Sequence, residues 1–439
     1  LNFTAAGGVT GTIGATNELA LVHFNAGGAA IALGGNAAAT DFTYGAADTV
    51  TAAGIITGNV DFANNAGTLN ANGGLITGNV DSTVGANGTL NFTAAGGVTG
   101  TIGATNELNA INVKAGATAH LSDVVAKATA INIGEVLGAG TLIRGGAVDF
   151  TINDGVNTAV TFGHADSVLQ LKNTDPLAAD HTVTLHGNLT GGVDDKGIVQ
   201  LTSSKVGQRL IIAKNGAETI GVSAVNRIKE LIVDGTATTT INSQVFAKTV
   251  TLSGNTGVVN FANGLDTGAA SAINVNQNVT LQGNITNTGG GITMNLGHNT
   301  LTYNQGTATF AGAVVINTTI NPGVGIGNIV IDANGGATVL DLATATGVTI
   351  NLNGTSHLAD IGQTYQLLTL ANGGTITPPG GVVAPALTNN DTAMPQPAWA
   401  YSNATGAVSN PNPVPNPVPN PVPNPVPNHD KPDINLEIT

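Results

Sequence analysis

Cysteine is absent from this chain of 439 residues, so no disulfide framework can hold it together. Aromatic residues make up only 3% of the sequence, which argues against a compact core built around large rings. Charged residues are also rare, at 9%, and with 41% hydrophobic residues the chain is too apolar to be intrinsically disordered. No uninterrupted apolar run is long enough to predict a membrane-spanning helix. Small and β-branched residues remain, and they suit a narrow interior built from many thin layers.

Basic residues are scarce and unevenly placed. The chain has 12 Lys and Arg against 26 Asp and Glu, which gives a net charge of −14. Every basic residue except Lys431 lies between positions 114 and 248, and that window is close to neutral. A nucleic-acid-binding protein needs a basic surface, so we expect no nucleic-acid partner. The acidic remainder favours solubility and keeps copies of the chain apart.

The sequence repeats itself with a period of about 20 residues. The string ITGNV occurs at 56–60 and again at 76–80, and GTLN occurs at 67–70 and 88–91. Short alternating apolar runs of strand length are separated by turns rich in Gly and Asn. Such a unit cannot bury its own apolar face and must stack on copies of itself. The pattern predicts an all-β fold, a right-handed parallel β-helix.

A stacked coil explains the recurrence of the same letters better than a β-sandwich does. A sandwich also has short strands and regular turns, but it gives no reason for residues to repeat at that interval. In a coil, equivalent residues lie above one another and form ladders of like side chains. This predicts that Asn79 lies above Asn59 and that Val80 lies above Val60.

Residues 1–376 form the predicted coil, and 110–234 is its least regular part, where we expect side loops. Within that part, 120–130 is interpreted as a loop or a short helix. The stretch 208–234 is interpreted as a loop or an insertion that leaves the coil, because it is charged and not repetitive. Its end, 227–234, fits either a helical turn or a strand.

The C-terminal part of the sequence changes character twice. Residues 340–376 hold a dense apolar run, and because a stack must protect its last edge, this segment is the predicted terminal cap. Residues 377–409 are rich in turn formers and are predicted to be loose. Residues 410–428 repeat Asn-Pro-Val-Pro, which predicts an extended, disordered linker ahead of a short tail at 429–439.

Candidate catalytic and metal-binding residues are few. His181 and His186 lie close to Asp180 in sequence, but no third or fourth ligand is evident, so no metal or cofactor is predicted. Asp194 and Asp195 could cleave a glycan only from the two sides of a groove, and a polysaccharide-active enzyme is kept as the alternative function. A hydrolase triad is assembled from distant segments, which argues against the sequence neighbours Ser356, His357 and Asp360.

The candidate partner-binding residues are the local concentration of basic charge in an otherwise acidic chain. Such a cluster could face an acidic glycan or receptor, although ordinary loop solubility explains it as well. Its members are Lys196, Lys205, Arg209, Lys214, Arg227 and Lys229.

Three groups of motifs carry a family resemblance. They are GNVDFANNAGTLNANGG with the repeated ITGNV, the TL-x-GN turns at Thr184, Thr251 and Thr280, and VTINLNG followed by GQTYQLLTLANGG. These motifs resemble the rickettsial surface cell antigens of the outer membrane protein A and B type. The likeness covers about residues 1–376, and 340–376 also resembles the autochaperone segment of autotransporter passengers.

The resemblance implies a passenger domain that is exported by a C-terminal β-barrel translocator, which this chain does not include. It also implies display on the bacterial cell surface and a non-catalytic role as an adhesin, an invasin or a surface-layer protein. The implied partner is a host-cell protein or glycan, and no cofactor is implied. The chain opens inside its own repeat, as expected of a fragment or a processed product.

Overall fold

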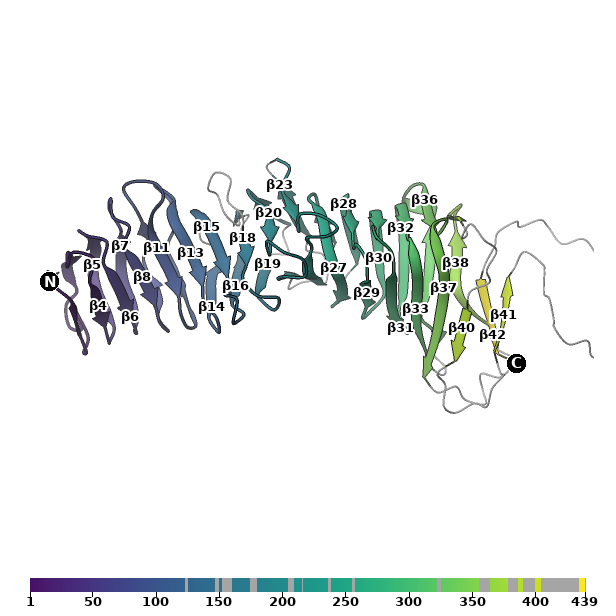
Figure 1. Cartoon of the computed structure of the whole chain (residues 1–439), viewed down its shortest axis with the longest axis horizontal. Coiled ribbons are helices and arrows are strands. Elements are labelled where there is room, and N and C mark those ends of the chain that lie inside the picture. The colour runs from purple at the N-terminus through teal and green to yellow at the C-terminus, as the bar shows by residue number, and fades with distance from the viewer. Residues whose placement is uncertain are drawn as a thin grey trace, which may run out of the picture.

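The computed structural model shows an elongated rod of short strands, with the two ends of the chain at opposite ends of the rod (Figure 1). The structure describes residues 1–122, 125–146, 150–151, 160–173, 180–203, 209–214, 216–235, 238–254, 257–321, 325–354, 364–377, 386–389, 399–403 and 434–438. Most strands pair in parallel with the equivalent strands of the turns before and after them. This pairing confirms the predicted parallel β-helix. Within the described ranges no helix is long and apolar enough to cross a bilayer, and the one helical element is a 3-10 turn, η1 (Ala333–Gly335).

Each turn of the coil contributes in order to three ladders of stacked strands. Ladder one contains β5 (Ala37–Tyr44), β7 (Ile56–Asp61), β9 (Leu75–Thr77), β12 (Gly96–Val98), β14 (Thr118–Ser122), β16 (Thr141–Gly146), β19 (Val168–Asn173), β22 (Ile198–Ser203), β25 (Ile228–Asp234), β27 (Gln244–Ser253), β29 (Ser271–Val275), β31 (Ile292–Gly297), β33 (Gly312–Asn321), β37 (Ala345–Gly354) and β40 (Ala386–Asn389). The short β34 (Gly325–Ile326) pairs antiparallel with the end of β33.

Ladders two and three complete each turn, and several long strands bend at a corner and contribute to two ladders. Ladder two contains β1 (Asn2–Phe3), β3 (Leu19–Phe24), the second halves of β5 and β7, β10 (Val80–Asp81), β17 (Phe150–Thr151), β20 (His181–Leu185), β23 (Leu210–Lys214), β26 (Thr239–Ile241), β28 (Val258–Asp266), β30 (Val279–Thr286), β32 (Thr300–Thr309), β35 (Asn328–Asp332) and β38 (Thr364–Ala371). Ladder three contains β2 (Gly7–Val9), β4 (Ala30–Leu33), β6 (Thr49–Ala52), β8 (Thr68–Ala71), β11 (Asn87–Phe92), β13 (Leu108–Val113), β15 (Ala128–Ile133), β18 (Val160–Phe162), β21 (Leu189–Thr190), β24 (Thr219–Ile220), the start of β27, the ends of β28, β30 and β32, then β36 (Thr338–Asp341) and β39 (Thr375–Thr377).

The register of the strands confirms the expected stacking of equivalent residues. Val60 pairs with Val80, and the backbone N–H of Asn79 donates to the side-chain oxygen of Asn59 at 3.1 Å. The repeated ITGNV string also has a backbone cause. A Cβ on Gly58, where φ is +131°, would clash with the carbonyl oxygen of Ala39 in the turn below. Only glycine fits a corner at which two backbones approach this closely.

The spacing between stacked residues is not constant along the rod. Between β13 and β15 it equals the predicted period, because Ile111 pairs with Ile131. The next steps of ladder one are longer, and they pair Leu142 with Leu169, Leu169 with Val199, and Val199 with Leu231. The strands involved remain short, so the additional residues lie between strands. The repeat therefore blurs in the sequence while the stack itself continues.

The prediction that residues 208–234 leave the coil is wrong from position 209 onwards. β23, β24 and β25 take their places in ladders two, three and one, paired with the turns before and after them. The open choice at 227–234 is settled as a strand, β25. In the region 120–130, the described residues continue β14 and begin β15, without a helix.

Inward-facing aliphatic side chains fill the coil in vertical rows. In ladder three, Ile111 pairs with Ile131, which pairs with Val160, and the row continues through Leu189 to Ile220, all buried. Burying one such side chain fully stabilises the fold by roughly 1.5–3 kcal/mol. Because each turn repeats this contribution, the thin layers expected from the composition make a continuous core.

A group of stacked aromatic rings lies near the N-terminal end of that core. The ring centroids of Phe24 and Tyr44 lie 5.1 Å apart, and those of Tyr44 and Phe62 lie 4.7 Å apart. All three side chains are buried. A chain with 3% aromatic residues therefore still has a local ring stack, which the composition alone did not predict.

The C-terminal end of the rod differs from the body. β38 pairs in parallel with β35 on one side and antiparallel with β42 (Ile434–Ile438) on the other, and β42 pairs antiparallel with β41 (Trp399–Asn403). β40 also adds to ladder one beyond residue 376, so the stack extends past the segment expected to end it. The linker at 410–428 lies outside the described residues.

Candidate functional site

Three of the basic residues singled out by the sequence lie at the corner where the chain passes from a strand of ladder three to the next strand of ladder one. They are Lys196, Arg227 and Lys229. Successive turns of the coil stack their loops there. The backbone N–H of Gly197 donates to the carbonyl of Ala165 at 3.2 Å. The backbone N–H of Asp195 donates to the carbonyl of Arg227 at 3.1 Å, which links the loop 191–197 to the loop 221–229. We call this surface the charged corner; it consists of 163–167, 191–197, 221–229 and Lys248.

Arg227 is the centre of the charged corner and is almost entirely enclosed. Its side chain is 6% exposed and donates to both carboxylate oxygens of Asp194, at 3.0 and 2.9 Å, and to Asp195 at 3.3 Å. The carbonyl oxygens of Thr267 and Ala269 accept from its remaining nitrogen at 2.6 and 2.7 Å. All five guanidinium donors are thus used within the chain. Arg227 holds neighbouring turns together and has no donor left for an external partner.

Two other cations of the charged corner, Lys229 and Lys248, are also paired with carboxylates. Lys229 forms an ion pair with Asp166, and its hydrogen bond lowers the pKa of that carboxyl. Lys248 forms an ion pair with Asp195. The sequence reasoning missed Lys248, although it lies close to one repeat period after Lys229 and stands one turn above it. Lys196 donates to the carbonyl of Gly163 at 3.3 Å.

The remaining candidates of the basic cluster lie elsewhere. Arg209 directly precedes β23 in ladder two, and its guanidinium lies 2.7 Å from the carboxylate of Asp180 and lowers the pKa of that carboxyl. Lys214 ends β23 and is exposed. Lys205 lies outside the described residues. The five described residues of the cluster therefore do not form one continuous patch.

The described candidate metal and catalytic residues, His181, His186, Asp194 and Asp195, do not come together in one site. His181 begins β20 and is buried, and His186 follows that strand. In the part of the chain that the structure describes, no three His, Asp or Glu side chains come together as ligands. Asp194 is held by Arg227, whose hydrogen bond lowers the pKa of the carboxyl. The trio Ser356, His357 and Asp360 lies outside the described residues.

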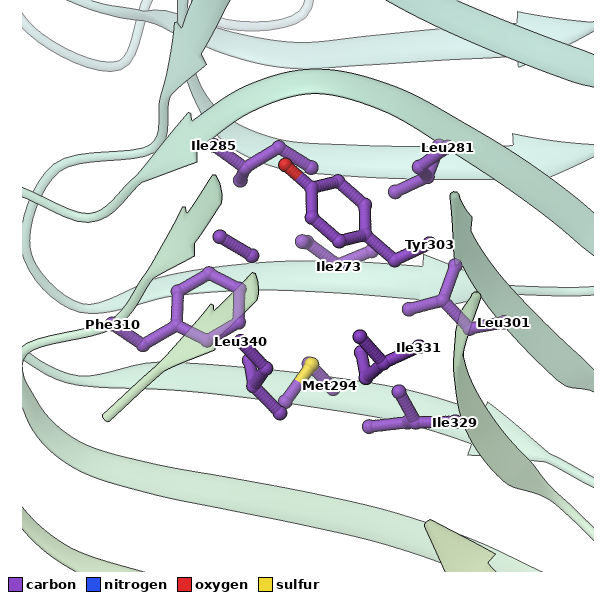
Figure 2. A pocket seen from close by; sticks show the side chains of 11 residues that line it. Ile273, Leu281, Ile285, Met294, Leu301, Tyr303, Phe310, Ile329, Ile331 and Leu340 are labelled. Atoms are coloured by element: carbon purple, nitrogen blue, oxygen red, sulfur yellow. The ribbon is translucent and has the colours of Figure 1, made fainter. Parts of the chain in front are cut away.

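One cavity lies inside the coil near its C-terminal end. Its volume is about 20 Å³, and its lining is wholly apolar, with Met294, Tyr303 and Phe310 among the side chains that point into it (Figure 2). The hydroxyl of Tyr303 donates to the carbonyl of Gly283. A space of this size could hold about one water molecule, and an apolar wall offers that water no partner. This cavity is a packing defect and cannot hold a substrate.

A shallow groove lies on the outer side of ladder one. It crosses four stacked strands and is lined by Thr249, Ala272, Thr293 and Val315, one from each. None of its lining residues is acidic or aromatic. Cleavage of a glycosidic bond requires two carboxyl groups that flank the bond, and this groove supplies neither.

Two known proteins are similar to part of the chain. Outer membrane protein A of Rickettsia conorii is 30% identical over 258 residues, an alignment that covers 52% of this chain and 12% of the relative. Outer membrane protein A of Rickettsia rickettsii is 31% identical over 258 residues, with 52% and 10% covered. The chain thus spans only about a tenth of the length of these relatives. No protein-family profile matches it, and no solved structure matches it.

Proposed function

We propose that this chain is a length of an autotransporter passenger that is displayed on the bacterial cell surface and acts without catalysis in adhesion to host cells. Invasion and a surface-layer role belong to the same proposal. The observation that supports it most is the similarity to outer membrane protein A of two Rickettsia species over half of the chain. The proposed partners are a host-cell protein or glycan and a β-barrel translocator.

The architecture supports a role in physical display. The three ladders make a stiff rod whose interior is filled by stacked side chains, and its outer surface is long and repetitive. Exported chains of this kind can fold turn by turn, since each added turn completes its hydrogen bonds on the previous one. A rod of this kind holds surface residues away from the membrane and offers them to a partner.

The alternative, a polysaccharide-active enzyme, would need an acid and a base on either side of a groove. The paired carboxylates Asp194 and Asp195 are occupied by Arg227 and Lys248. The lowered pKa of Asp194 suits a counter-ion, whereas a general acid requires a raised pKa. These contacts favour the non-catalytic proposal.

Binding of the purified chain to cultured host cells tests the proposal. We expect saturable binding that unlabelled chain competes away. A charge-reversed pair of variants, Lys196→Glu and Lys214→Glu, tests whether basic residues carry the contact, with Lys114→Glu as the matched control on another turn of the coil. Absence of saturable binding would overturn the adhesive role.

Point variants are the correct tool here, because a deletion of 208–234 would remove strands from all three ladders. Incubation of the same preparation with acidic polysaccharides tests the alternative. Release of reducing ends that is lost in Asp194→Asn and Asp195→Asn, while cell binding is absent, would favour the enzyme.

A further inference from the structure

A tight turn at residues 135–138 exposes two aliphatic side chains on the corner between ladders three and one. The backbone N–H of Glu135 donates to the carbonyl of Gly138 at 2.8 Å, and the backbone N–H of Gly138 donates to the carbonyl of Glu135 at 3.0 Å. Val136 and Leu137 form the tip of this turn and are 79% and 96% exposed. Aliphatic side chains this exposed contribute nothing to the stability of the single chain.

A second turn of the same construction lies on the same corner at residues 223–226. Ser223 and Asn226 exchange backbone hydrogen bonds of 3.3 and 3.1 Å, and Val225 at the tip is 81% exposed. Val193 and Val222 beside it are 54% and 42% exposed. Each turn therefore presents a small apolar prong.

The two prongs are separated by a defined distance along the rod. The first follows β15 and the second follows β24, and ladder three steps from β15 through β18 and β21 to β24. Three steps at about 4.8 Å each place the prongs roughly 14 Å apart along the axis. The loops 163–167 and 191–197 lie between them.

The surface between the prongs has no excess of negative charge, because Asp166, Asp194 and Asp195 are paired with Lys229, Arg227 and Lys248, and Lys196 adds one further cation. Asp166 and Asp195 stand there with Lys229 and Lys248 as their ion-pair partners, and these four side chains are between 32% and 57% exposed. The rest of the chain outside 114–248 has 14 acidic residues and one basic residue. Two copies of a chain with net charge −14 repel each other across most of their surfaces, but not here.

We propose that this two-pronged surface is the contact between two copies of the chain, packed antiparallel about a two-fold axis that passes midway between the prongs. Such an axis places the Val136–Leu137 prong of one copy against the Val225 prong of the other, so both apolar tips are buried at once. It also brings the balanced ion pairs of the two copies together, where each carboxylate can meet a lysine of the other copy. The contact is short, and the association is accordingly weak. This inference does not depend on the proposed adhesive function.

Sedimentation velocity over a range of concentrations tests the association. We expect a concentration-dependent dimer that Leu137→Asp and Val225→Asp each weaken by roughly tenfold or more, because a charge then enters the apolar contact. Val84→Asp is the matched control, since Val84 is 46% exposed on a different turn of the coil. Unchanged thermal unfolding of each variant shows that the fold is intact.

The orientation is tested by disulfide cross-linking, for which the chain is well suited because it contains no cysteine. In a mixture of Val136→Cys and Val225→Cys variants, the antiparallel arrangement predicts that the mixed cross-link forms faster than either homologous one. A monomer at all concentrations would overturn the proposal, and so would a dimer that the tip variants leave unchanged. Flotation of a monomeric chain with phosphatidylcholine vesicles, lost in Leu137→Asp, would overturn it in favour of a lipid surface.

Discussion

The side-chain amide of Asn112 donates to the side-chain oxygen of Asn91, one turn below, at 2.8 Å. The same bond joins Asn132 to Asn112 at 2.7 Å and Asn91 to Asn70 at 2.8 Å. The amides of Asn91 and Asn112 each accept from the turn above and donate to the turn below, so the row has a direction along the rod. A row of this kind requires that every turn keeps the same register, and it therefore opposes slippage of one turn against another.

Replacing Asn112 with Asp should break the row at one point. The new carboxylate cannot donate to the oxygen of Asn91, and the facing acceptors repel, so we expect a loss of about 1–3 kcal/mol in unfolding free energy at neutral pH. Urea denaturation measures this loss. Asn109→Asp on the exposed side of the same strand is the control, because the amide of Asn109 makes only a long bond of 3.4 Å to Thr89.

The pH dependence of the Asn112→Asp variant has a definite sign. Protonation of the introduced carboxyl restores a donor, so its pKa is raised in the folded state. The restored stability is present below the unfolded pKa and is lost as the pH rises through the folded pKa. The deficit should therefore shrink in acid, and an equal deficit at pH 3 and pH 7 would contradict the role of the amide donor.

Removal of Arg227 should destabilise the middle of the rod. Arg227→Ala leaves the carbonyl oxygens of Thr267 and Ala269 without the guanidinium donor. It also removes the guanidinium from Asp194 and Asp195, which keep only the backbone N–H of residue 227 and the ammonium of Lys248, and we expect a loss of about 2–3 kcal/mol. The carboxylates of Asp194 and Asp195 are about a third exposed, so water screens their interaction with the guanidinium. The expected loss of stability is therefore near the lower end of the range for buried ion pairs. Arg209→Ala is the matched control, because Arg209 is 56% exposed and its solvent-screened pair with Asp180 should contribute little to stability.

Acid titration gives an independent check on Arg227. The pKa of Asp194 is lowered in the folded chain by the hydrogen bond from Arg227. Its contribution to stability is therefore present above the unfolded pKa and is lost as the pH falls through the folded pKa. The unfolding midpoint of the native chain should fall more steeply in acid than that of Arg227→Ala, and parallel curves would refute the linkage.

The stacked coil could be predicted because the recurrence of ITGNV at 56–60 and 76–80 places Val60 under Val80. The wide turns between β16 and β25 could not be predicted in the same way. A stack requires register only within its strands, and a loop of extra residues at a corner adds little closure entropy. The residue types between the strands are therefore free to vary. Because the repeat is not visible there, the charged stretch after residue 208 was wrongly predicted to be a loop or an insertion.

The charged corner was predictable only in part. The basic residues were visible in sequence, and applying the repeat period to Lys229 would have found Lys248. The enclosure of Arg227 was not visible, because its carboxylate and carbonyl partners lie 33 and 40 residues away in neighbouring turns. Contacts of this kind depend on the register of several turns at once, which no local motif encodes.

Filling the internal cavity should stabilise the rod. Ala308 lines the cavity in ladder three, between Ile285 and Leu340 in the adjacent turns. Ala308→Val adds two methyl groups beside unfilled space, and we expect a gain of about 0.5–1 kcal/mol in unfolding free energy. Ala247→Val is the control, because Ala247 is buried but does not line the cavity, and overpacking there should cost about 1–3 kcal/mol. Equal losses in both variants would show that the cavity cannot accept added volume.

Asp48 should be the most sensitive single carboxylate near the N-terminal end. It is fully buried and accepts from the backbone N–H groups of Ala26, Gly28 and Ala29 at 2.7, 2.7 and 2.9 Å, which ties one turn of the coil to the turn before it. Asp48→Asn keeps the shape but turns one acceptor into a donor that faces an N–H, so we expect a loss of about 1–3 kcal/mol.

Asp341→Asn is the matched control for Asp48→Asn, because the side chain of Asp341 accepts at 3.0 Å only from Ala343 in its own loop. A bond within one loop does not hold two turns together, and its loss should lower stability by less. Native-state hydrogen exchange can separate the two cases. We expect faster exchange at the backbone N–H groups of 26–29 in Asp48→Asn, together with earlier opening of β3 and β4, while Asp341→Asn leaves those rates unchanged. Protection that is lost to the same extent in both variants would show that the contact between turns does not depend on Asp48.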